Sequence, residues 1–221
     1  YRPVATECQR MMKTYTRLSS LPPELLVAGI DEVGVGPLAG PMVACTVIFR
    51  AGHTPIPGVT DSKTLSPAKI TKLREEILDE CEDFGFGWVS SEEIDKMGHG
   101  DARREVLARS FQDLSEVPGH IYLDGTMHVP AISHAEKLAK ADSLIWIVGA
   151  ASILAKFEQV FWMETVAHEN WPLYGFDQHR GYGTALHHAA LERYGACPAH
   201  RRSVKTIKKL QPQRRRSRWS P

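Results

Sequence analysis

The sequence has few cysteines and no long apolar run. Its four cysteines are scattered, without a Cys-x-x-C pair, which argues against a zinc site and a dense disulfide framework. They are Cys8, Cys45, Cys81 and Cys197. We therefore expect a cytoplasmic protein in a reducing environment. The longest apolar run, about residues 144–155, is too short to span a bilayer, and the N-terminal residues show no apolar signal segment. We expect no membrane partner.

Acidic residues are missing from the C-terminal end of the chain. Of 221 residues, 27 are Lys or Arg and 26 are Asp or Glu, for a net charge of +1. Residues 201–221 hold nine basic and no acidic residues, which leaves 18 basic and 26 acidic residues, a net charge of −8, in residues 1–200. Such a chain suits a polyanionic partner only where the tail or a local patch attracts it. A merely solubilising, disordered tail fits the composition equally well.

The common nucleotide-binding and nucleophile motifs are also absent. No G-x-x-x-x-G-K-[ST] phosphate loop occurs, and no Ser/His/Asp arrangement is evident. Residues 34–39 fit a loose G-x-G-x-x-A dinucleotide pattern, but Pro37 and Pro41 would break the helix that such a site requires. Four C-terminal histidines lack metal-ligand spacing, and we interpret them as surface residues. They are His179, His187, His188 and His200.

Short apolar runs and helical periodicities follow one another along the chain, which predicts an α/β fold with helices packed on a sheet. Ser66 followed by Pro67 indicates a helix start, since Ser is a frequent cap and Pro favours the first helical position. The expected strands cover residues 25–30, 42–49, 84–90 and 120–125, with a short strand before residue 137. The expected helices begin at Pro67, cover about 101–115 and 145–169, and run from the cap Thr184 to Tyr194.

Acidic residues occur where catalytic groups usually lie in such folds. Asp31 and Glu32 directly follow the first apolar run, Asp124 ends the run at 120–125, and Asp142 precedes a buried apolar helix. Carboxylates are the ligands that Mg²⁺ and Mn²⁺ prefer. Two such cations about 3.5–4 Å apart can activate water and stabilise the leaving oxygen of a phosphodiester.

Each later acid also has an ordinary structural explanation. Asp124 with Gly125 is a common turn pair, and Asp142 is a possible helix cap. The adjacent pair is harder to explain in this way, because neighbouring strand residues point to opposite faces of a sheet. We therefore favour a ligand site at the end of the strand that precedes Asp31 and Glu32.

Other side chains are candidates for phosphate or sugar contacts. They are Ser62 and Lys63 in one loop, Lys156 on the apolar helix, and Arg180 and Tyr182 in the segment HRGYGT. Tyr182 lies between two glycines and is expected to be exposed enough to stack on a sugar or base. An ordinary loop tyrosine is the alternative.

Seven segments occur in an order that resembles type 2 ribonuclease H, the bacterial ribonuclease HII family. They are GIDEVGVGPLAGP, DSKTLS, IYLDG, KADS, AASILAK, YGFDQHRGYGT and HRRS. The resemblance covers about residues 26–204, and its specificity comes from the set of segments rather than from any single one. It implies an α/β ribonuclease H-like fold, a central mixed β-sheet flanked by helices, with a small C-terminal helical extension.

The sequence pattern predicts a lead-in at residues 1–24 with a short helix at 4–18, and a peripheral helix from about residue 200 followed by a disordered basic tail, with the tail assigned to residues 205–221. The resemblance implies that residues 25–204 are the catalytic domain with its extension, and it also implies an activity and a substrate. The enzyme would be an endonuclease that cleaves the RNA strand of RNA–DNA hybrids and incises 5′ to ribonucleotides embedded in duplex DNA. Two divalent ions, Mn²⁺ or Mg²⁺, would serve the hydrolysis, which leaves 5′-phosphate and 3′-hydroxyl ends. We expect a monomer.

By motif position, the resemblance assigns roles to single residues. The catalytic and metal-binding acids would be Asp31, Glu32, Asp124 and Asp142. Tyr182 would stack on the deoxyribose just past the ribonucleotide. The other substrate contacts would be Gly34, Val35, Gly36, Ser62, Lys63, Ser152, Lys156 and Arg180.

The chain departs from the family pattern at two places. The Gly-Arg-Gly of the family is Gly34-Val35-Gly36 here, so the backbone can still meet a 2′-hydroxyl but the Arg charge is lost. After Lys156, the usual Arg-Asp pair is replaced by Gln159-Val160. Two other interpretations remain open at this point: a protein of the same fold that binds hybrids without cutting, and a nuclease with another substrate, such as branched DNA.

Overall fold

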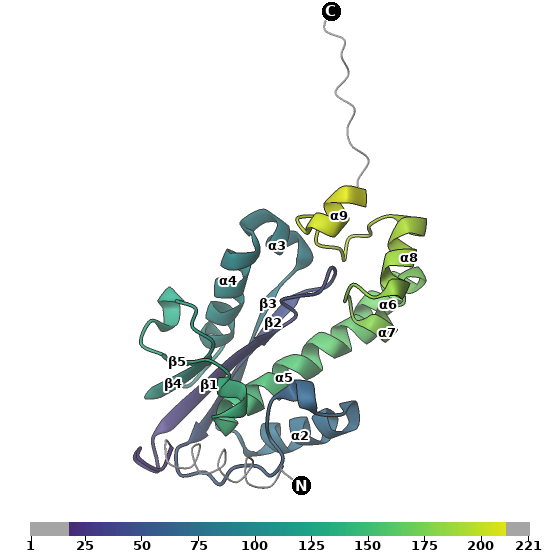
Figure 1. Cartoon of the computed structure of the whole chain (residues 1–221). Coiled ribbons are helices and arrows are strands. Elements are labelled where there is room, and N and C mark those ends of the chain that lie inside the picture. Colours follow the sequence, from purple (N-terminus) through teal and green to yellow (C-terminus); the bar gives the residue numbers. More distant parts are fainter. Residues whose placement is uncertain (1–17, 211–221) are drawn as a thin grey trace, which may run out of the picture.

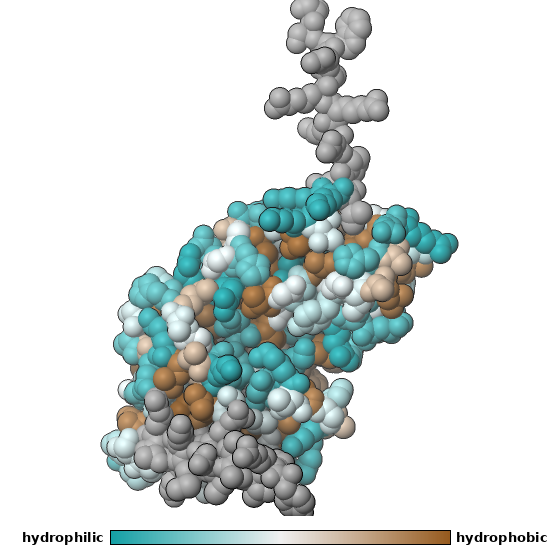
Figure 2. Space-filling model, in the orientation of Figure 1, coloured by the Kyte–Doolittle hydropathy of each residue, from teal (hydrophilic) through white to brown (hydrophobic). Residues whose placement is uncertain are grey.

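The computed structural model describes residues 18–210 (Figure 1). The short helix expected at residues 4–18 and most of the basic tail lie outside the described residues. None of the helices within residues 18–210 is long and apolar enough to cross a membrane. On the face shown in Figure 2, hydrophilic side chains predominate and hydrophobic ones gather in small patches.

A five-stranded mixed sheet forms the centre of the described chain, with strand order β3-β2-β1-β4-β5. The pairs β1–β2 and β2–β3 are antiparallel, whereas β1–β4 and β4–β5 are parallel. The expected fold class is thereby confirmed. The strands are β1 (Leu26–Val33), β2 (Met42–Arg50), β3 (Asp83–Val89), β4 (His120–Asp124) and β5 (Glu136–Leu138).

One face of the sheet is covered by α5 (Trp146–Trp162), which packs on β1 and β2, with α2 (Pro67–Glu80) against α5 (Figure 1). Close contact with β1 depends on Gly29, because a Cβ there would lie 2.5 Å from the backbone carbon of Ile147. The apolar residues of α5 and α2 form a core with alternate residues of β1 and β2.

The other face is covered by α4 (His99–Gln112), which follows α3 (Ser91–Met97). Here Gly87 of β3 permits the contact, since a Cβ would lie 1.9 Å from the carbonyl oxygen of Val106. A second core lies between this face and α4. The structure is therefore three-layered, with α5 and α4 on opposite sides of one sheet.

A smaller helical region continues from α5 and has its own apolar core. It contains the π-helical turn η4 (Met163–Ala167), α6 (His168–Asn170), η5 (Pro172–Tyr174), α7 (Phe176–His179), α8 (Ala185–Tyr194) and α9 (Lys205–Leu210). The remaining short helices are η1 (Ser62–Thr64), η2 (Pro130–Ile132) and η3 (Ala141–Ser143).

The expected elements are largely present, and the main differences are these. β1 continues to Val33, because its pairing with β2 extends to Val43. Helix α3 was not expected. A peripheral helix was expected from about residue 200, and α9 lies at Lys205–Leu210, inside the segment assigned to the tail, because Ile207 is fully buried in the third core. The domain boundaries themselves stay a prediction.

Candidate active site

Asp31 and Glu32 lie within strand β1, not beyond its end. Both residues remain paired with β2, opposite Cys45 and Ala44. Their side chains therefore point to opposite faces of the sheet. Asp31 is 3% exposed and lies on the α5 face, whereas the Glu32 side chain is 7% exposed and contacts Arg103 of α4. The interpretation of a site just beyond the strand was wrong, because the antiparallel partner extends the strand.

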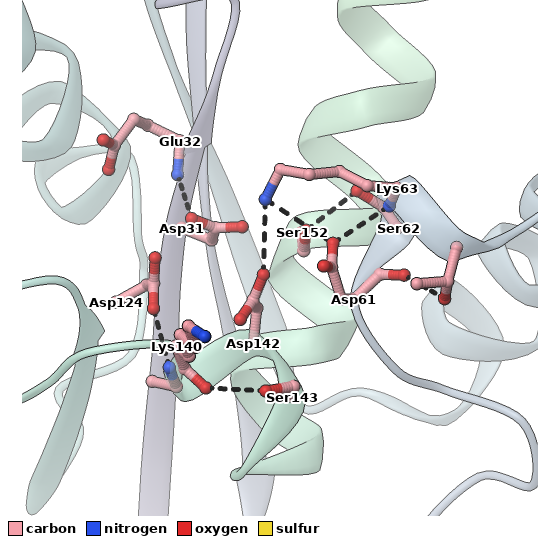
Figure 3. Close-up of polar contacts among 12 residues, drawn as sticks. Asp31, Glu32, Asp61, Ser62, Lys63, Asp124, Lys140, Asp142, Ser143 and Ser152 are labelled. Carbon is pink, nitrogen blue, oxygen red and sulfur yellow. Dashed lines mark hydrogen bonds and ion pairs between the residues drawn. The ribbon is translucent and has the colours of Figure 1, made fainter. Parts of the chain in front are cut away.

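Asp124 is the last residue of β4 and lies next to Asp31 in register, since Ile30 pairs with Leu123. Its Oδ1 accepts a 2.6 Å hydrogen bond from the backbone N–H of Ala141. This bond fixes the start of η3, the turn that carries Asp142. One carboxylate thus holds the turn that presents another (Figure 3).

Asp142 is 5% exposed and faces the ammonium group of Lys63. The distance from Lys63 Nζ to Asp142 Oδ2 is 3.4 Å, and Asp61 Oδ1 lies 3.5 Å from the same nitrogen. Burial lowers the pKa of Lys63, but the charges of Asp61 and Asp142 outweigh it and raise the pKa overall. Lys63 is therefore held as a cation above the acids (Figure 3).

Two buried serines line the α5 side of Asp31. The Oγ atoms of Ser62 and Ser152 lie 2.9 Å apart, and both residues are nearly inaccessible to solvent. A hydrogen bond from Ser152 to Asp31 lowers the pKa of that aspartate. Ser152 is therefore placed to favour the ionised form of Asp31.

The electrostatics of the site favour a cation. Burial, and then the charges of Glu32, Asp124 and Asp142, raise the pKa of Asp31 well above its ordinary value. Burial and the charges of Asp124 and Asp61 likewise raise the pKa of Asp142. Repelling, desolvated carboxylates of this kind fit hard divalent cations.

The four predicted acids are not all gathered in one place. Asp31, Asp124 and Asp142 share the α5 side, while Glu32 is held on the α4 side by Arg103. Within residues 18–210, no three His, Cys, Asp or Glu side chains are arranged so that they could hold a metal ion together. The Oε2 atom of Glu32 is nevertheless buried without a hydrogen-bond partner among the described residues. A buried carboxylate oxygen without a partner fits the role of a metal ligand.

The Gly34-Val35-Gly36 loop is fixed by hydrogen bonds from a buried side chain, Arg201. Arg201 is fully buried, and burial lowers its pKa to about 10. Its guanidinium donates hydrogen bonds to the carbonyls of Gly34, Val35, Gly40 and Pro41. A ring nitrogen of His99 also lies 2.9 Å from the Val35 carbonyl oxygen. Because their carbonyls are occupied, Gly34 and Val35 are fixed in place. Gln159, which the family pattern would replace by Arg, is buried beside Gly34.

Tyr182 is 44% exposed, and Lys156 Nζ lies 6.0 Å from the centroid of its ring. Burial and the charge of Arg180 lower the pKa of Lys156. Arg180 itself donates a 2.7 Å hydrogen bond from Nε to Glu164, so its charge is shared with that carboxylate. The loop of Tyr182 is joined to the glycine loop by the 2.8 Å bond from Leu38 N to Gly181 O.

Three of the four histidines assigned to the surface are buried, so that interpretation was wrong for His179, His187 and His200. The N–H of Cys197 donates to Nδ1 of His200, whose Nε2 lies 2.9 Å from Nε2 of His187. His200 must therefore donate to His187, whose Nδ1 then donates to the Tyr182 carbonyl, 2.9 Å away. Burial lowers the pKa of His187 and His200 to about 4, so both rings in this chain of hydrogen bonds to the Tyr182 loop are neutral.

Sequence reasoning missed three residues of the site. Asp61 directly precedes the predicted Ser62 and Lys63, so its position was a usable signal. Arg201 lies in the segment HRRS, but nothing in that segment shows which carbonyls it meets. Arg103 reaches Glu32 across 71 positions of sequence, and no local pattern indicates that contact.

A mixed sheet with helices on both faces, and a buried aspartate on its central strand beside two further aspartates, defines a ribonuclease H-like nuclease. The family model of ribonuclease HII matches residues 28–212. The chain is 42% identical over 188 residues to the ribonuclease HII of Chlamydia caviae, covering 84% of this chain and 86% of that relative. The chain belongs to the ribonuclease HII family, whose members are divalent-metal-dependent hydrolases that cleave RNA in RNA–DNA hybrids.

Solved structures agree with this placement. The ribonuclease H2 of Pyrococcus horikoshii is 27% identical, with a TM-score of 0.70, and the match covers 84% of this chain and 97% of that one. Bst-RNase HIII, solved in complex with Mn²⁺, has a TM-score of 0.71 at 20% identity, covering 87% of this chain and 71% of that one. At this identity the second likeness shows the fold alone.

Proposed function

We propose that the chain is an endonuclease that cuts the RNA strand of RNA–DNA hybrids and also incises 5′ to single ribonucleotides embedded in duplex DNA. The products would carry 5′-phosphate and 3′-hydroxyl ends. One observation carries the proposal most: Asp31 is buried on the central strand beside Asp124 and Asp142, and their like charges repel its own. Carboxylates are buried together at this cost chiefly where a cation joins them.

Asp31, Asp124 and Asp142 would hold the divalent ions, with Glu32 as the fourth ligand. Two Mn²⁺ or Mg²⁺ ions supply an activated water and charge neutralisation at the scissile phosphate. The donor set is all oxygen, which matches both ions. The Mn²⁺ complex of Bst-RNase HIII, which has the same fold, is consistent with that choice.

The chain's own residues would bind and orient the duplex. Lys63 and Lys156 offer ammonium groups to phosphates, and Tyr182 offers an exposed ring for stacking on a deoxyribose. The Gly34-Val35-Gly36 backbone, fixed by Arg201, would approach the 2′-hydroxyl that distinguishes RNA from DNA. Ser62, Ser152 and Arg180 complete the proposed contacts. We propose that the protein acts in the cytoplasm as a monomer on these two nucleic acid substrates.

The test is cleavage of two labelled duplexes by purified protein with Mn²⁺ or Mg²⁺. One duplex is a continuous RNA–DNA hybrid and the other contains one ribonucleotide. Asp31→Asn and Asp124→Asn should each lower cleavage by about 100- to 1000-fold, the loss typical of removing one electrostatic group from an active site, while duplex binding persists. Asp79→Asn, an exposed change on α2, is the matched control and should cleave like the wild type.

The alternatives give different results in the same experiment. A non-cleaving hybrid-binding protein would bind both duplexes and cut neither, with either ion. A nuclease for branched DNA would leave both duplexes intact and cut a branched substrate. Full activity in Asp31→Asn would contradict the assignment of the site.

A further inference from the structure

The carboxylate of Glu32 is separated from the other three acids by an ion pair with Arg103. Nε of Arg103 lies 3.0 Å from Oε1 of Glu32, and Nη2 contacts the same oxygen. Oε2 is left buried without a hydrogen bond among the described residues. Figure 3 shows the Glu32 side chain turned away from Asp31, Asp124 and Asp142. Glu32 is therefore bound by an internal cation.

The strand geometry would allow Glu32 to approach the other acids. Strand β4 ends at Asp124, and the last pair between β1 and β4 is Ile30 with Leu123. Glu32 thus lies one position beyond the level of Asp124, the last residue of the neighbouring strand. The alternation of β1 directs the Glu32 side chain to the α4 face, and the contact with Arg103 holds its carboxylate there.

Arg103 is suited to a contact that can be released. Its side chain is 31% exposed, so the guanidinium can regain water when it leaves the carboxylate. A guanidinium and a divalent ion can each neutralise the negative charge of a buried carboxylate. They cannot easily do so together, because their two positive charges repel at close range. Lys63 offers a parallel case at Asp142, where an ammonium neutralises another acid of the site.

We propose that Arg103 is a positioning residue that competes with a divalent cation for Glu32, so that metal binding requires release of the Arg103–Glu32 ion pair. This inference rests on the proposed function, because it assumes that Glu32 is a metal ligand. It makes Arg103 a determinant of how much Mn²⁺ the free enzyme needs.

Calorimetric titration of the full-length protein with Mn²⁺, without nucleic acid, tests the inference. Arg103→Gln should bind Mn²⁺ roughly tenfold more tightly than the wild type, because the competing charge is gone. Arg103→Lys keeps a charge and should stay near the wild-type affinity. Arg104→Gln is the matched control: Arg104 pairs with Asp101 instead of Glu32, so its loss should change nothing. Unchanged or weaker binding by Arg103→Gln overturns the inference.

A double-mutant cycle with Glu32→Gln separates this mechanism from general charge repulsion. If Arg103 acts through Glu32, Arg103→Gln should have no effect on Mn²⁺ affinity in the Glu32→Gln background. A persisting tenfold gain there overturns the inference. The Mn²⁺-induced rise in melting temperature is a second readout and checks that each variant is folded. If the wild type binds Mn²⁺ and cleaves hybrids but Arg103→Gln behaves like it, only the inference fails. If the wild type binds no Mn²⁺, the proposed function fails as well.

Discussion

Protonation of Asp31 decides whether the site can bind a cation. Burial and three neighbouring acids raise its pKa, and among its hydrogen-bond partners Ser152 acts in the opposite direction. Since a raised pKa means that protons persist to higher pH, the ionised, cation-binding form appears only as pH rises through that value. Cleavage should therefore fall on the acidic side of the pH profile.

Ser152→Ala should move this acidic limb to higher pH. The variant removes a hydrogen bond that favours the carboxylate, so the pKa of Asp31 rises further and more base is needed to ionise it. Rates on a continuous hybrid, measured across pH with saturating Mn²⁺, check the direction. Ser143→Ala is the control, because the Ser143 hydroxyl donates to the Lys140 carbonyl and to none of the acids. A limb that stays in place, or moves to lower pH, would contradict the role given to Ser152.

At the scale of elements, the position of α5 against β1 fixes the site. Ser152 lies on α5, and the turn η3 that carries Asp142 directly precedes this helix. The contact depends on the missing side chain of Gly29, where a Cβ would lie 2.5–2.6 Å from backbone atoms of Ile147 and Val148. Backbone atoms cannot move aside as a flexible side chain can, so α5 itself would have to shift.

Gly29→Ala should therefore destabilise the fold by about 1–3 kcal/mol, the usual cost of overpacking, and lower cleavage beyond that loss. Urea unfolding, with activity measured well below the transition, separates the two effects. Gly100→Ala in α4 is the control, because its Cβ would meet nothing within 4 Å and Ala in a helix should stabilise by about 0.5–1 kcal/mol. Wild-type stability in Gly29→Ala would show that α5 tolerates the displacement.

Sequence alone predicted the elements better than it predicted their contacts. The caps at Ser66 and Thr184 were correct because capping is local: each side chain accepts a bond from an N–H three residues later. Helix α3 was missed although Ser90 and Glu93 form a capping box, a signal that sequence does carry. The extension of β1 to Val33 depends on pairing with β2, which no local pattern contains.

In the candidate site, too, the sequence predicted the residues better than their arrangement in space. Motifs identified Asp31, Glu32, Asp124 and Asp142, but not that Asp31 and Glu32 lie on opposite faces of the sheet. That follows only from knowing that both are inside a paired strand. The neutral histidines were misjudged because their burial depends on the third core, built from segments far apart along the chain.

At the scale of the whole molecule, charge is divided between an acidic body and a basic end. Residues 1–200 carry a net charge of −8, and residues 201–221 carry nine basic residues. Helix α9 belongs to the folded part, because Ile207 is fully buried in the third core. A deletion that removes basic residues without disturbing this core must therefore begin after Leu210.

Deletion of residues 211–221 removes four arginines and no acid. If these arginines contact phosphates, each contact releases condensed counterions, and the slope of log K against log salt should become shallower by up to roughly 3–4 units. Equilibrium binding to an RNA–DNA hybrid, measured between about 50 and 200 mM salt with EDTA to prevent cleavage, gives this slope. Replacing the four arginines by glutamine should reproduce the deletion, and replacing them by lysine should restore the wild-type slope. An unchanged slope in the deletion variant would mean that the tail does not contact phosphates and serves solubility alone. The duplex would then bind the acidic body through the basic residues Lys63, Lys156 and Arg180.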